Sequence, residues 1–142
     1  MKLTSRILAF ALSAAAVAGC TEAKSPGQLL AENPADPGHR TMNEFNAKVR
    51  DLEPGPRGYL FELEYKGKPL EITGRLEVKL TGSIAFSVPP EQHLIWGTFT
   101  PADHDRAFAL APGTFVRIRG TMVETLERNS VSLDQATIVA VY

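Results

Sequence analysis

Residues 70–80 read LEITGRLEVKL, and this stretch decides the fold. Leucine, isoleucine, valine and Gly74 occupy every second position, while charged residues and threonine occupy the positions between them. A strand points alternate side chains to opposite faces, so this period of two predicts a long strand with one buried and one solvated face. Gly74 falls on the buried face, where the missing side chain would permit the sharp coiling that a small barrel needs.

Four more strands are predicted after this one, at 84–88, 93–100, 115–124 and 131–140. Gly120 has an inward position in the second-to-last strand, as Gly74 has in the first. The inward set of the last strand changes parity between Leu133 and Ala136. This change predicts a β-bulge near Asp134 and Gln135.

A short helix is predicted near 101–111, between the third and fourth of these strands. Thr100 is a suitable N-cap, Pro101 suits the first helical position, and Asp103 and Asp105 favour the positive helix end. The resulting order predicts an all-β protein with a minor helix, a five-stranded OB-fold-like barrel. A five-stranded sandwich fits less well, because it does not require that helix.

A second helix is predicted over 41–52, packed outside the barrel. Its apolar face would consist of Met42, Phe45, Val49 and Leu52. Thr41 and Glu44 have the spacing of a capping box at its start. Residues 59–65 alternate between apolar and polar, which favours a strand and leaves a helix as the alternative. The folded domain is therefore predicted to cover 41–142.

Three segments resemble the tRNA-anti-like OB-fold family, which is common among bacterial exported lipoproteins. Residues 65–76 (YKGKPLEITGRL) look like its opening strand, and 110–121 (LAPGTFVRIRGT) look like a later element. Residues 133–139 (LDQATIV) are similar to its closing strand, with Ala136 where many members have cysteine. The resemblance covers about 60–142 and implies an OB fold. It brings no catalytic residues, and the family name does not imply tRNA binding.

The first 19 residues are predicted to be an export signal. Lys2 and Arg6 precede an uncharged, mostly apolar stretch at 7–18. This stretch is shorter than the ~20 apolar residues that a membrane-spanning helix needs. Retention as an uncleaved anchor is an alternative.

The signal ends in Val17-Ala18-Gly19-Cys20, which resembles the lipobox of bacterial lipoproteins. Cleavage is expected between Gly19 and Cys20, and Cys20 is predicted to carry S-diacylglycerol and N-palmitoyl groups. Cys20 is the single cysteine of the chain, so it cannot form an internal disulfide. Cleavage after Ala18 by an ordinary signal peptidase is the alternative.

Residues 20–40 are predicted to be the lipidated N-terminus and a flexible tether, because 21–40 contain three prolines and two glycines. The predicted cellular location is the cell envelope, with membrane lipid as a partner through acylated Cys20. Thr21 is not the aspartate that favours inner-membrane retention in enteric bacteria. This favours the outer membrane, facing the periplasm.

Nucleic acid is predicted not to be a partner. Removal of residues 1–19 takes away Lys2 and Arg6, which leaves 13 basic against 16 acidic residues and a net charge of −3. Such a surface has no general attraction for polyanions. The outward arginines Arg75, Arg117 and Arg119 could form a basic platform with nearby aromatic residues. Glutamates share their face, so cross-strand ion pairs are the favoured interpretation.

The aromatic residues near that platform are Phe86, Trp96 and Phe99, and of these Phe86 and Trp96 are predicted to be core residues because each shares a strand face with apolar neighbours. Core positions would leave the rings of Phe86 and Trp96 unable to stack on a base.

No catalytic, cofactor or metal site is predicted. Asp103-His104-Asp105, with Glu91 and His93 upstream, carries residue types that bind zinc or perform acid–base chemistry. Consecutive residues at a helix start point ~100° apart, so they do not converge on one centre. The helix-start interpretation explains both aspartates. A periplasmic enzyme or metal site using His93 or His104 remains an alternative.

The favoured function is a non-enzymatic OB-fold lipoprotein that binds a protein or glycan ligand in the envelope. The alternative function at the same cellular location is a structural or assembly accessory of an envelope complex.

Overall fold

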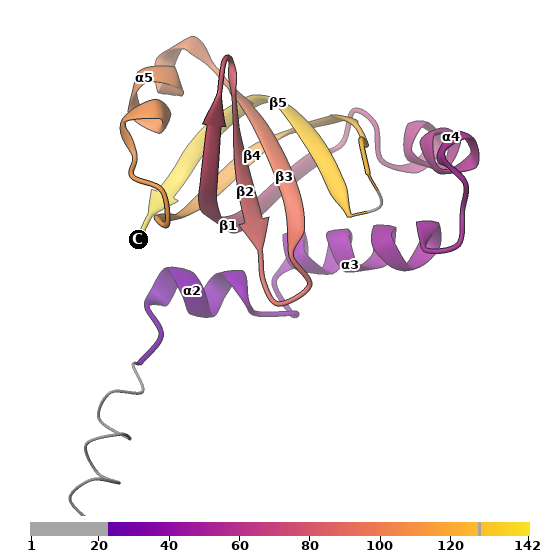
Figure 1. Ribbon diagram of the computed structural model, residues 1–142, viewed down its shortest axis with the longest axis horizontal. Coiled ribbons are helices and arrows are strands. Elements are labelled where there is room, and N and C mark those ends of the chain that lie inside the picture. The colour runs from indigo at the N-terminus through magenta and orange to yellow at the C-terminus, as the bar shows by residue number, and fades with distance from the viewer. Residues whose placement is uncertain (1–22, 128) are drawn as a thin grey trace, which may run out of the picture.

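The computed structural model describes residues 23–127 and 129–142 (Figure 1). The export signal predicted at 1–19 and the lipidation predicted at Cys20 lie outside the described residues. Within the described ranges, no helix has both the length and the apolar composition needed to cross a membrane.

A closed barrel forms the centre of the described chain (Figure 1). Its strands are β1 (Pro69–Leu80), β2 (Ser83–Val88), β3 (His93–Phe99), β4 (Phe115–Glu124) and β5 (Ser130–Val141). They follow the order β1-β2-β3-β5-β4, and β4 pairs again with β1. β3 and β5 are parallel, and the other pairs are antiparallel. Helix α5 (Pro101–Ala109) connects β3 to β4. The predicted OB fold and the helix predicted near 101–111 are confirmed.

The barrel closes because β1 changes partner halfway along its length. The segment Pro69 to Arg75 pairs with β4, and the segment Arg75 to Leu80 pairs with β2. The strand must therefore coil sharply around Gly74. A Cβ atom at Gly74 would lie 2.9 Å from Phe86 Cβ and 3.2 Å from the Ser87 carbonyl oxygen. Only glycine leaves room for this close approach, as the sequence predicted.

A second close approach occurs between β4 and β5. A Cβ atom at Gly120 would lie 2.9 Å from Leu133 Cβ and 3.0 Å from the Asp134 carbonyl oxygen. The register between the two strands shifts next to this point, and Gln135 has a positive φ of 52°. The β-bulge predicted near Asp134 and Gln135 is confirmed.

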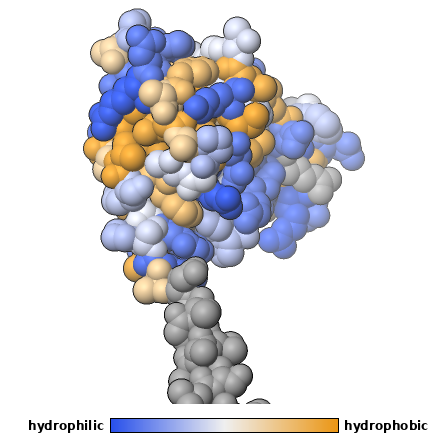
Figure 2. Space-filling model, turned by 60° about the vertical axis from the view of Figure 1, so that its left-hand side comes forward, coloured by the Kyte–Doolittle hydropathy of each residue, from blue (hydrophilic) through white to orange (hydrophobic). Residues whose placement is uncertain are grey.

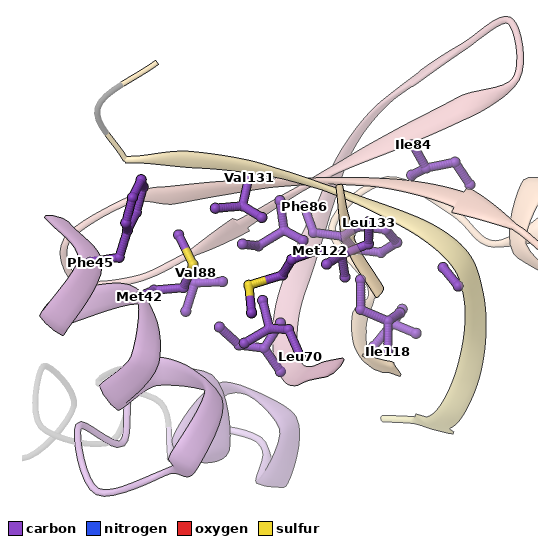
Figure 3. Packing of buried hydrophobic residues seen from close by; sticks show 14 of the residues in the cluster. Met42, Phe45, Leu70, Ile84, Phe86, Val88, Ile118, Met122, Val131 and Leu133 are labelled. Atoms are coloured by element: carbon purple, nitrogen blue, oxygen red, sulfur yellow. The ribbon is translucent and has the colours of Figure 1, made fainter. Parts of the chain in front are cut away.

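Helix α3 (Pro37–Val49) covers one end of the barrel. Met42, Phe45 and Val49 are buried in the same cluster as the barrel interior. Figure 3 shows Met42 next to Val88 of β2, and both belong to the same buried cluster as Met122 of β4. The helix predicted over 41–52 therefore exists, and its predicted face is the packed face.

The start of α3 corrects the predicted boundary at 41. Asp36 is the N-cap, and its carboxylate accepts a hydrogen bond of 3.4 Å from the backbone N–H of His39. Pro37 occupies the first helical position. Thr41, predicted to be the cap, lies inside the helix and donates its hydroxyl to the Pro37 carbonyl oxygen at 3.0 Å.

The flexible tether predicted for 20–40 is wrong for its second half. Helix α2 (Pro26–Ala31) starts at the N-cap Ser25, whose hydroxyl oxygen accepts from the backbone N–H of Gln28 at 3.1 Å. A Cβ atom at Gly27 would lie 2.6 Å from Tyr142 Cβ and 2.7 Å from Phe115 Cβ. The helix therefore rests directly on the barrel, and Pro26 and Pro37 begin helices rather than prevent them.

The strand favoured for 59–65 is also wrong, because helix α4 (Pro54–Glu64) occupies this segment. Phe61 is buried and Leu63 is 65% exposed, so the apolar alternation does not correspond to one buried face. Phe61 and Tyr65, four residues apart, pack against Phe45 of α3 at ring-centroid distances of 5.7 Å and 4.9 Å. This aromatic contact with α3 holds α4 outside the barrel.

Arg117 of β4 connects the start of α3 to the barrel. Its guanidinium donates to Asp36 Oδ1 at 3.0 Å, to Glu71 Oε2 at 3.0 Å and to Thr73 Oγ1 at 3.1 Å. Burial acts against the charge, but these acidic partners outweigh it and raise the pKa of Arg117. The predicted cross-strand pairing of this arginine with a glutamate is confirmed. The additional partner Asp36 ties the first turn of α3 to the sheet.

The close approach at Gly74 gives a stability prediction. Gly74→Ala should destabilise the protein by about 1–3 kcal/mol, because the new methyl group overpacks against Phe86. Urea unfolding of the full chain would measure the difference. Gly58→Ala on α4 is the matched control, since its Cβ would meet nothing within 4 Å. This control should be neutral or stabilising by up to about 1 kcal/mol. Equal effects at both positions would contradict the packing argument.

The Arg117 contacts give a second prediction. Arg117→Ala should cost about 3 kcal/mol, because it leaves the carboxylate of Asp36, 4% exposed, without its cationic partner. Arg119→Ala is the control, since Arg119 lies on the same strand and is exposed. That control should stay within about 0.5 kcal/mol of the parent. Thermal unfolding and protease cleavage before α3 would both report the loss, and similar curves for the two variants would contradict it.

Candidate functional site

A groove runs along the outer side of β3. Its volume is about 580 Å³. Trp96 and Thr98 of β3 line it, together with residues at the ends of the other four strands: Leu80, Ser83, Val123, Glu124, Ser132, Leu133 and Asp134. Leu126, in the β4–β5 connection, closes one side. This is the region in which OB folds bind oligonucleotides and oligosaccharides, between the β1–β2 and β4–β5 connections.

The groove is apolar with acidic groups at its edge. Leu80 and Leu126 are 50% and 51% exposed, and Trp96 is half-buried. Glu124 and Asp134 bring two carboxylates to the lining, and among the described residues no lysine or arginine lines it. Figure 2 shows hydrophobic residues at the surface over the upper part of the molecule in that view. Exposed apolar surface of this kind favours a binding role.

The position of Trp96 corrects the prediction that it is a core residue. The inward side chains of β3 are His93, Ile95 and Phe99, so Trp96 lies on the opposite face. The error has a physical cause. One inward position is a histidine and another is Gly97, so the apolar alternation of Leu94 and Trp96 was the stronger signal. Phe86, by contrast, is 1% exposed, and its predicted core position is confirmed.

A second cluster of functional groups lies where α3 meets the β2–β3 turn. His39 of α3 and His93 of β3 are fully buried, and Glu91 of the turn is half-exposed. His39 Nε2 lies 2.6 Å from Glu91 Oε2, and His93 Nε2 lies 4.0 Å from the same oxygen. One ligand atom from each residue lies within 4.8 Å of the other two.

Two further contacts orient the histidines of this cluster. His39 Nδ1 donates to the Ala31 carbonyl oxygen at 2.9 Å, so its Nε2 faces Glu91. His93 Nε2 lies 2.6 Å from Asn43 Oδ1, one turn after His39 on α3. His93 Nδ1 is buried and has no hydrogen-bond partner among the described residues.

The ionisation of the cluster follows from its burial. Burial lowers the pKa of His93, and the charge of Glu91 opposes this effect only in part. For Glu91, burial acts to raise the pKa, but the hydrogen bond with His39 and the charges of the two histidines lower it overall. Near neutral pH the cluster therefore holds an ionised carboxylate next to a neutral His93.

The sequence singled out only part of this cluster. From the sequence, Glu91 and His93 were grouped with Asp103-His104-Asp105. In the structure they lie with His39 instead, and the cluster contains neither the two aspartates nor His104. His104 is exposed on α5 and stacks on Phe108 at a centroid distance of 4.5 Å. Asp103 serves the fold by accepting a hydrogen bond of 2.9 Å from the backbone N–H of Ile138.

His39 was missed because it was assigned to the tether. The signal that could have found it is Asp36-Pro37, a helix N-cap followed by a proline at the first helical position. A helix starting there places His39 on the same face as Met42 and Val49, and therefore toward the barrel.

No protein-family model matches the sequence, and no curated protein matches it either. Solved structures do match. A mitochondrial single-stranded DNA-binding protein from S. cerevisiae has 14% identity and a TM-score of 0.37, covering 52% of this chain and 94% of that one. A second crystal form of it gives 10% identity and a TM-score of 0.36, with coverages of 54% and 99%. A "putative nucleic acid-binding lipoprotein" from Klebsiella pneumoniae has 19% identity and a TM-score of 0.43, covering 76% of this chain and 100% of that one.

These neighbours correct one prediction from the sequence. Nucleic acid was predicted not to be a partner, whereas the structural neighbours include a single-stranded DNA-binding protein and a lipoprotein described as nucleic acid-binding. The prediction that excluded nucleic acid as a partner is therefore not supported. Net charge is a poor guide here, because an OB fold contacts its ligand through one local surface. The resemblance to the tRNA-anti-like family is confirmed as far as the OB fold.

Proposed function

We propose that the protein is an envelope lipoprotein of the tRNA-anti-like type whose OB barrel is a non-enzymatic binding module for a protein or glycan ligand. The observation that carries the proposal is the groove on the outer side of β3, with Trp96 among its lining residues. An aromatic residue in a partly desolvated pocket is the type of residue that dominates binding energy at interfaces.

The chemistry of the groove narrows the ligand. Its apolar walls favour a ligand with an apolar surface, and the carboxylates of Glu124 and Asp134 favour hydrogen-bond donors or positive charge. A peptide segment with apolar and basic side chains has both properties. A glycan has both as well, since its hydroxyl groups donate hydrogen bonds to carboxylates and its ring faces pack on an aromatic residue.

Trp96 provides a direct assay, because it is the single tryptophan of the chain. Ligand binding in the groove should change its fluorescence. Trp96→Ala should raise the Kd at least about tenfold, a loss of about 1.4 kcal/mol. Calorimetric titration of the full chain in detergent, with envelope peptides and peptidoglycan fragments as probes, would measure the change.

Leu29→Ala is the control for this assay. Leu29 is 57% exposed, comparable to the groove leucines, but lies on α2 and does not line the groove. This variant should bind as the parent does. If a probe binds without changing Trp96 fluorescence, or binds equally to Trp96→Ala and the parent, the groove is not the binding surface.

Single-stranded nucleic acid is the second candidate ligand, and the position of Trp96 favours it. OB folds that bind single strands stack bases on aromatic side chains, each worth about 1–3 kcal/mol. The same fluorescence titration with an oligonucleotide tests this candidate. Binding that weakens steeply with salt would identify phosphate contacts.

The proposal includes an anchor at Cys20, with the protein held in the outer membrane and facing the periplasm. Each acyl CH₂ group buried in a bilayer contributes roughly 0.8 kcal/mol, so several chains hold a protein almost permanently. Cys20→Ala should yield an unanchored protein or a stalled precursor. Detergent partitioning and labelling with a fatty-acid analogue would show this. Label that persists on the variant, or a parent protein that stays aqueous and unlabelled, would contradict lipidation.

A further inference from the structure

We propose that His39, Glu91 and His93 form a binding site for a divalent transition-metal ion of the zinc class. Glu91 and His93 come from the β2–β3 turn and the start of β3, and the fold brings His39 of α3, far away in the sequence, next to them. The site is separate from the groove at Trp96 and does not depend on the function proposed for that groove.

The donor atom of His39 is already oriented for a metal. Because a carbonyl oxygen can only accept, the Ala31 contact requires a hydrogen on Nδ1 of His39. Nε2 faces Glu91, and its hydrogen bond to the carboxylate requires a hydrogen on Nε2, so a bound ion would displace this hydrogen and take its place between the two groups. Metal-binding histidines typically donate their second ring nitrogen to a carbonyl or carboxylate in this way.

His93 contributes a second nitrogen from the barrel. It is fully buried at the first position of β3, where an apolar side chain would serve the core better. Asn43 is its one hydrogen-bond partner among the described residues, and Nδ1 has none. Binding through Nε2 would exchange the Asn43 contact for a bond to the ion.

Glu91 supplies an anionic ligand and a route for the ion. Its side chain is 38% exposed, whereas the two histidines are at most 1% exposed. The carboxylate therefore lies at the surface end of the cluster and can adjust. Bonds of about 2.0–2.2 Å place ligand atoms of a tetrahedral site a little over 3 Å apart. The present ligand atoms, within 4.8 Å of one another, need only small side-chain movements to reach this geometry.

The donor set indicates the class of ion. Two imidazoles and one carboxylate suit zinc, cobalt or nickel, whereas magnesium and calcium prefer sets made of oxygen alone. Three protein ligands leave a fourth position for water. A bound ion would join α3 to the β2–β3 turn, so occupancy should stabilise the attachment of this helix to the barrel.

The test uses the full chain in detergent with Cys20→Ala, which removes the only thiol that could bind zinc. After chelator treatment, Zn²⁺ should raise the Tm, and Co²⁺ should give visible d–d absorption. Mg²⁺ should do neither. The Kd for Zn²⁺ would be measured by competition with a chelating dye.

Three variants and a matched control locate the ion. His39→Gln, Glu91→Gln and His93→Gln should each weaken Zn²⁺ binding at least about tenfold. The control is His104→Gln, which changes the remaining histidine of the chain, exposed on α5, and should bind Zn²⁺ like the parent. If either buried-histidine variant fails to fold, Glu91→Gln decides, because its side chain lies at the surface.

Two results would overturn the proposal. One is a parent protein whose Tm does not change with Zn²⁺, which would make the cluster a purely hydrogen-bonded contact between α3 and the barrel. The other is Zn²⁺ binding that is equally tight in Glu91→Gln and His104→Gln, which would place the ion elsewhere.

Discussion

The pairing of β1 with two neighbours is the constraint on which the rest of the structure depends. Arg75 is opposite Phe115 of β4 and also opposite Ser87 of β2, so the sheet closes around this residue. Closure requires the backbone at Gly74 to approach Phe86 more closely than a side chain would allow. Once the barrel is closed, the outer side of β3 and the two connections that surround the groove have fixed positions. The groove is thus a consequence of where β1 bends.

The barrel could be predicted from the sequence because its signals are local and agree with one another. The alternation in 70–80, the two inward glycines and the change of parity before Ala136 each require the same geometry. The helices could not be predicted equally well. In 59–65 the pattern of Phe61, Leu63 and Tyr65 is compatible with the period of a strand or of a helix. The helix forms because it lets Phe61 and Tyr65 pack against Phe45. That contact exists only in the folded molecule.

The functional groups were harder to predict than the fold, for a reason seen in β3. Its inward positions include His93 and Gly97, which carry no hydrophobic signal, so the sequence alone pointed to the wrong face for Trp96. The same histidine looks like an isolated polar residue until α3 brings His39 and Asn43 next to it. Sites assembled from distant segments leave no spacing pattern in the chain. Only the helix start at Asp36-Pro37 was available as a clue.

The ordered helices also change how an anchored protein would present its groove. With α2 packed on the barrel, the chain from Cys20 to Ser25 spans at most about 18 Å when fully extended, so an acylated Cys20 would hold the barrel close to the membrane. Helix α2 contacts Phe115 and Tyr142, where β4 begins and just after β5 ends (Figure 1). The groove lies where β4 ends and β5 begins. A ten-residue strand such as β4 is about 30 Å long. In the proposed anchored protein, the two ends of this strand pair would therefore separate the lipid from the ligand, and the groove would stay accessible to a partner while the other end faces the bilayer.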